Sequence, residues 1–147
     1  MSDSVKLLEE CNKGCNTAVK SMIKILEHVD NEKIREMIDK YTEEHKKLEE
    51  KSELLLKQQG KSEKTPGFIV ENMISMNTTM KIGWSSEEKK DEKVLEMLRE
   101  GCEKGIQSLQ QKQEEYEQAS KESHEIAETI IAVEKDFLEE IDAFYER

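Results

Sequence analysis

Apolar residues recur along this chain at alternating steps of three and four, which is the spacing of one face of an α-helix. In and just after residues 4–28 this stripe consists of Leu8, Cys11, Cys15, Ala18, Met22, Ile25 and Val29. Over residues 32–59 it consists of Ile34, Ile38, Tyr41, His45, Leu48, Ser52 and Leu55. The pattern predicts two long helices joined by the short reversal "HVDNEK", in which Asp30 or Asn31 can cap the second helix.

The second half of the chain repeats this arrangement after a loop. Gly60 ends the second predicted helix, "KSEKTPG" follows as a loop, and residues 67–84 form a shorter amphipathic stretch. A further helix is expected from residue 86, with Ser85 or Ser86 as its cap. An unbroken helix from there to the end of the chain would be roughly 90 Å long, so we place a turn near Ser120. The last helix then buries Ile126, Ile130, Val133, Phe137, Ile141 and Phe144.

Composition agrees with long helices. The chain has 147 residues, of which 39% are charged and 35% hydrophobic, with one proline and six glycines. Few chain breakers and strong periodicity favour helices over either disorder or an all-β fold. The sequence therefore predicts one all-α domain over residues 1–147, an antiparallel four-helix bundle with an extra, shorter crossover helix.

Charge and cysteine content restrict the partners and the compartment. The net charge of −11 disfavours nucleic acid and anionic membranes, and no stretch approaches the about 20 apolar residues of a membrane span. The N-terminal residues contain no apolar signal core. Three cysteines do not form a disulfide framework. These features predict a cytoplasmic protein whose partner is another protein or a second copy of itself, such as a homodimer.

Two polar residues fall on the predicted buried faces. In an antiparallel hairpin, residues equally far from the turn lie at the same height, so a turn at Asp30 places Cys15 opposite His45. A turn at Ser120 likewise places Ile106 opposite Glu134, which lies within the apolar arc of its helix. A buried acid is costly unless it is paired or binds a metal. We therefore expect His45 and Glu134 to meet near the middle of the core.

This layout resembles the ferritin-like superfamily, and more narrowly an uncharacterised bacterial branch of it. The stretches that carry the resemblance are "LLEECNKGCNTAVKSM", "PGFIVENMISMNTTMKIGW" and "VLEMLREGCEKGIQSLQQKQEEYEQA". They extend over nearly the whole chain. The resemblance implies two helical hairpins, a crossover between them and polar groups at mid-height.

The resemblance also implies where metal ligands would lie. Ferritin-like oxidases hold two metals with a Glu from one helix of each hairpin and a Glu-x-x-His pair from the other. At the matching heights this chain has Cys15, Thr42 with His45, Ile106, and Glu134 with Phe137. Only His45 and Glu134 of the six ligands remain, which argues against iron storage or iron oxidation.

Two functions stay open from the sequence. One is a non-catalytic bundle with a degraded di-metal site, in which His45 and Glu134 form a structural pair and the protein acts through protein interaction or self-association. The other is a protein that binds a single iron or zinc ion through His45, Glu134 and Cys15. No catalytic or cofactor-binding residue is predicted, and enzymatic activity is not the favoured reading.

Overall fold

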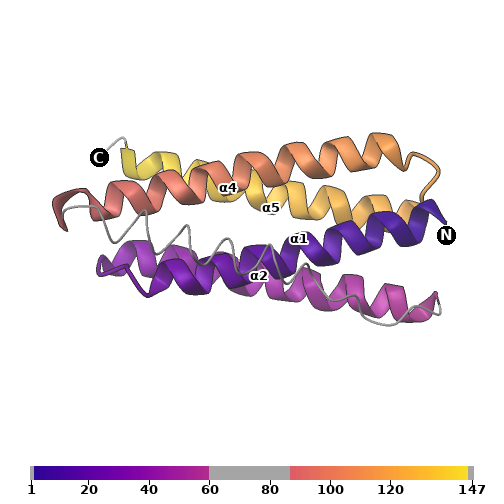
Figure 1. Cartoon of the computed structure of the whole chain (residues 1–147), viewed down its shortest axis with the longest axis horizontal. Coiled ribbons are helices and arrows are strands. Elements are labelled where there is room, and N and C mark those ends of the chain that lie inside the picture. The colour runs from indigo at the N-terminus through magenta and orange to yellow at the C-terminus, as the bar shows by residue number, and fades with distance from the viewer. Residues whose placement is uncertain (1, 60–86, 146–147) are drawn as a thin grey trace.

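The computed structural model describes residues 2–59 and 87–145, and these residues form four helices and no strand (Figure 1). The helices are α1 (Asp3–Leu26), α2 (Glu32–Gln58), α4 (Glu87–Glu115) and α5 (Lys121–Tyr145). They lie along a common long direction and pack into one elongated bundle. The prediction of an all-helical bundle is confirmed. The shorter helix expected over residues 67–84, and its neighbouring cap at Ser85 or Ser86, lie outside the described residues.

The first two helices begin and end where local sequence signals place them. Ser2 caps α1 by accepting a hydrogen bond from the Val5 amide at 3.2 Å. At the other end of α1, the Arg35 guanidinium donates to the carbonyls of Leu26 and Val29, which lie at and just beyond the last residue of the helix. Arg35 therefore ties the first turn of α2 to the end of α1.

Asn31 is the residue that caps α2, which decides between the two predicted candidates. Its side-chain oxygen accepts a hydrogen bond from the Ile34 amide at 3.1 Å. We expect Asn31→Ala to lower the free energy of unfolding by about 1 kcal/mol, because this amide then loses its partner. Asn31→Asp keeps an acceptor at the same place and should stay near the wild-type value. Urea unfolding of the two variants makes the comparison, and an equal loss in both would exclude the cap as the cause.

Side-chain hydrogen bonds fix the register of α1 on α2. Asn12, which is buried, donates to the Glu49 carbonyl at 3.1 Å and to the Ser52 hydroxyl at 3.2 Å. Farther along α1, the Met22 sulfur accepts from the Thr42 hydroxyl at 3.5 Å. Later residues of α1 thus meet earlier residues of α2.

The two halves of the chain meet at both ends of the bundle. Ser4 near the start of α1 accepts from the Ser120 amide at 2.7 Å, and its carbonyl accepts from the Ser123 hydroxyl at 3.2 Å. At the far end, Asp30 pairs with Lys90 at 3.6 Å. Figure 1 shows the same arrangement, with the N-terminus beside the turn between α4 and α5. The predicted turn near Ser120 is confirmed, since the Ser120 hydroxyl accepts from the Ser123 amide at 3.1 Å.

The buried side chains form two apolar clusters along the bundle. One cluster gathers Met22, Ile25, Ile38, Tyr41, Leu98, Phe137 and Ile141 with their neighbours. The other gathers Leu8, Cys15, Leu48, Leu56, Ile106, Ile126 and Ile130 with theirs. Most residues of the predicted stripes lie in these clusters, but Ala18, Val133 and Phe144 are only partly buried. Near the end of α2, Leu56 rather than Leu55 is fully buried. None of the described helices combines the length and apolar composition that a membrane crossing requires.

Candidate functional site

His45 lies on α2 among the apolar residues of the bundle interior, with 2% of its surface exposed. Its ring nitrogen Nδ1 is 2.7 Å from the Tyr41 carbonyl oxygen, one helical turn earlier. A carbonyl oxygen can only accept, so Nδ1 carries a hydrogen and donates it. The other nitrogen, Nε2, is therefore the atom left to interact with the rest of the core.

Glu134 on α5 supplies the group that faces this nitrogen. It is 7% exposed, and its Oε1 is 3.5 Å from Nε2 of His45. That separation allows an electrostatic interaction but is too long for a strong hydrogen bond. Among the described residues, neither Nε2 of His45 nor Oε2 of Glu134 has a hydrogen-bond partner. The predicted meeting of these two residues in the core is therefore present, with both side chains incompletely satisfied.

Burial controls the charge of Glu134. Loss of water raises the pKa of its carboxyl above the ordinary value, and the neighbouring His45 opposes this shift without cancelling it. Because Nδ1 of His45 already donates to Tyr41, a neutral imidazole presents a lone pair to the carboxyl group. Nε2 of His45 and Oε1 of Glu134, 3.5 Å apart, therefore attract each other only when one proton is shared between these two side chains, on either of them.

Gly105 of α4 forms the wall behind the carboxyl group. A β-carbon built on Gly105 would lie 2.5 Å from Oε2 and 2.6 Å from Oε1 of Glu134, well inside van der Waals contact. Gly105 thus leaves the space that the carboxyl group fills. The sequence places Ile106 at about this height, and the structure shows that the adjacent Gly105 is the residue against the carboxyl group.

The three cysteines are buried, free thiols. Burial raises the pKa of Cys11 and of Cys102 to about 12, and it raises that of Cys15 well above the ordinary value. The Glu134 carboxylate adds to the shift of both Cys15 and Cys102, which places these two thiols within its electrostatic reach. Protonated thiols are poor nucleophiles and poor metal ligands.

The donor atoms around His45 and Glu134 do not match those of the iron and zinc sites that the sequence suggests. Among residues 2–59 and 87–145, no three or more His, Cys, Asp or Glu side chains are placed to hold a metal ion together. His45 and Glu134 supply two donors, whereas zinc and iron sites use three or more protein ligands. Cys15 is the third predicted ligand, and its raised pKa disfavours the thiolate that would bind. The residues present therefore do not fit a di-metal centre, and we derive no chemistry through one.

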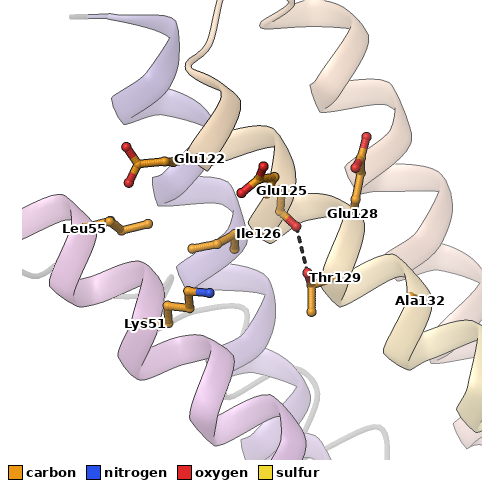
Figure 2. Close-up of a pocket in the computed structure, with 8 residues that line it drawn as sticks. All are labelled: Lys51, Leu55, Glu122, Glu125, Ile126, Glu128, Thr129 and Ala132. Carbon is orange, nitrogen blue, oxygen red and sulfur yellow. Dashed lines mark hydrogen bonds between the residues drawn. The ribbon is translucent and has the colours of Figure 1, made fainter.

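A surface groove of the described residues lies away from this pair. It is formed by α2 and α5 and is lined by Lys51, Leu55, Glu122, Glu125, Ile126, Glu128, Thr129 and Ala132 (Figure 2). Neither His45 nor Glu134 is among these residues. A substrate held in the groove would thus not contact the two polar residues of the core.

Comparison of the chain with protein-family models, with curated proteins and with solved structures gives no match. The resemblance to ferritin-like proteins thus rests on the sequence stretches and layout given above.

Sequence reasoning located His45 and Glu134 because each interrupts an apolar stripe. It did not predict that Gly105 leaves space for the Glu134 carboxyl group. A glycine on the buried side of a long helix indicates that another group approaches the backbone closely. Sequence reasoning also missed the carbonyl of Tyr41, which decides which nitrogen of His45 faces Glu134.

Proposed function

We propose that this protein is a non-catalytic, ferritin-like helical bundle that acts through contacts with another protein. Two features support the ferritin-like part. The contacts of Asn12 and Met22 with α2 run in opposite order along the two helices, as in an antiparallel hairpin. The ends of α1 and α2 also meet the ends of the second hairpin, through Ser4 with Ser120 and Asp30 with Lys90. Such pairing fits two hairpins joined by a long crossover.

One observation carries the non-catalytic part of the proposal. The buried acid–base pair of the described residues, His45 with Glu134, is enclosed by the core and is not reached by the groove. Catalytic groups must contact a substrate, and active sites are usually concave and open to it. A buried pair of this kind instead fixes how helices pack against one another.

A second candidate is a single-metal protein that uses His45, Glu134 and Cys15. It is favoured by the two unpartnered atoms, Nε2 of His45 and Oε2 of Glu134, because orphaned buried acceptors can reflect an ion. Against it stand the small number of donors and the protonated thiol of Cys15. We therefore rank it second.

Metal analysis separates the two candidates. We expect untagged protein, purified without chelator, to contain far less than one iron or zinc per chain. Adding iron(II) in air should produce no faster oxidation than buffer alone, and a chelator should leave the melting temperature unchanged, because a core metal would stabilise the fold by mass action.

A metal present at one ion per chain and lost in His45→Ala would overturn this proposal. Asp39→Ala is the matched control, since Asp39 is an exposed residue of the same helix. A metal that disappears in both variants would belong to neither side chain.

A further inference from the structure

The groove between α2 and α5 has an apolar floor and one acidic side. Ile126 is buried at its base, and Leu55 approaches from α2 (Figure 2). The Thr129 hydroxyl donates to the Glu125 carbonyl at 2.8 Å, one turn earlier on α5. The groove has a volume of about 530 Å³, and its other lining residues are exposed, so it is open along its length.

Three glutamates of α5 form what we call the acidic rim: Glu122, Glu125 and Glu128. They lie at intervals of three residues, about 4.5 Å of helix axis each, and all three line the groove. Only Glu125 has an ion pair among the described residues, with Lys121 at 3.9 Å, and both of those side chains are more than half exposed. The acidic rim thus carries negative charge that the described part of the chain leaves largely uncompensated.

The remaining wall does not neutralise the rim. Lys51 is the only basic residue that lines the groove, and no described carboxylate pairs with it. An apolar floor beside carboxylates at helical spacing is complementary to a helix with apolar residues on one face and lysines or arginines at its edge. A second copy of this chain is a poor occupant, because its net charge of −11 repels the same rim.

We propose that the groove between α2 and α5 binds a basic amphipathic helix of a partner protein, with its apolar side against Leu55 and its cations on the acidic rim. This inference rests on the proposed function, in that it names the surface through which the bundle contacts another protein. It requires nothing of His45 or Glu134.

The probe is a fluorescent synthetic helix of leucine and lysine, about five turns long, titrated with the full chain at near-physiological salt. We expect saturable binding to the wild-type protein. Changing all three residues of the acidic rim to glutamine should weaken this binding at least tenfold, because the local charges that hold the lysines are lost.

A matched control removes the same number of charges elsewhere. Its three substitutions lie on an exposed stripe of α4 and are Glu96→Gln, Glu100→Gln and Glu103→Gln. This control changes the net charge equally, so a response to overall charge alone would weaken binding in both variants. We expect a change of less than about twofold in the control, since only local charges are held within a Debye length of the bound helix. Circular dichroism checks that both variants stay folded.

Four results would overturn the inference. Absence of saturable binding, or equal weakening in the two variants, would mean that no site for a basic helix exists here. A dimer in sedimentation that dissociates when the acidic rim is removed would assign the groove to a second copy. Tighter binding of a synthetic peptide of residues 67–84 would assign it to this chain itself. None of these results changes the outcome of the metal analysis. That analysis tests the proposed non-catalytic bundle separately from the groove.

Discussion

Replacing Glu134 by alanine is expected to lower the free energy of unfolding by about 1–3 kcal/mol at pH 5. The substitution removes the carboxyl group that lies 3.5 Å from Nε2 of His45, and with it the electrostatic attraction that partly offsets the burial of that nitrogen. It also empties the space against Gly105. Urea unfolding followed by circular dichroism measures the change.

The effect of Glu134→Ala should shrink as the pH rises. The raised pKa of Glu134 means that the folded protein holds this proton more tightly than the unfolded chain does. Its contribution to stability is therefore fully present below the ordinary glutamate pKa and is lost as the pH rises through the higher folded value. His45 from α2 lies 3.5 Å from Glu134, and the thiols of Cys15 and Cys102 interact with its carboxylate electrostatically.

Two comparisons make this result specific. Glu139→Ala alters an exposed residue of the same helix and should change stability by no more than about 0.5 kcal/mol at any pH. Replacing both His45 and Glu134 by leucine removes the two unpartnered polar atoms of this pair and should give a protein at least as stable as wild type. A penalty for Glu134→Ala that grew between pH 5 and pH 8 would show that the carboxyl group is not held protonated or paired as inferred.

Gly105→Ala is expected to destabilise the protein by about 1–3 kcal/mol, although alanine is the better helix former. The added methyl group would lie 2.5 Å from Oε2 of Glu134, so the carboxyl group would have to move from its position 3.5 Å from Nε2 of His45. This cost exceeds the about 0.5–1 kcal/mol that alanine contributes in a helix interior. Thermal and urea unfolding measure the difference.

Gly101 provides the internal control for this substitution. It lies one turn earlier in the same helix, and a β-carbon there would contact nothing within 4 Å. Gly101→Ala should therefore raise stability by about 0.5–1 kcal/mol. In a Glu134→Ala background, Gly105→Ala should also become stabilising, since the clash is gone. If Gly105→Ala stabilised the wild-type protein, the close approach of the carboxyl group to this backbone would be wrong.

The two substitutions address one physical feature, the space between α2, α4 and α5 that holds a buried acid. His45 attracts the carboxyl group from one side, and Gly105 makes room for it on the other. Stability would therefore be expected to depend on Glu134 in a way that an exposed glutamate cannot reproduce. The same arrangement explains how a bundle without a complete metal-ligand set keeps two polar groups in its core.

Much of the fold follows from short-range information in the sequence. Steps of three and four between apolar residues specify the helices, because side chains at that spacing share one face. Asn31 and Ser120 mark starts of helices, because their side chains accept hydrogen bonds from backbone amides that no helical carbonyl reaches. His45 and Glu134 could be predicted as buried because each falls in step with such a stripe.

Only the tertiary structure decided what these residues contact. Neighbouring residues of a helix point about 100° apart, so an error of one residue in register replaces Gly105 by Ile106 opposite Glu134. The 3.5 Å gap between His45 and Glu134 and the groove beside Ile126 both depend on how far α5 stands from its neighbours. That distance is set by side chains from several helices at once, and the pattern along any single helix does not contain it.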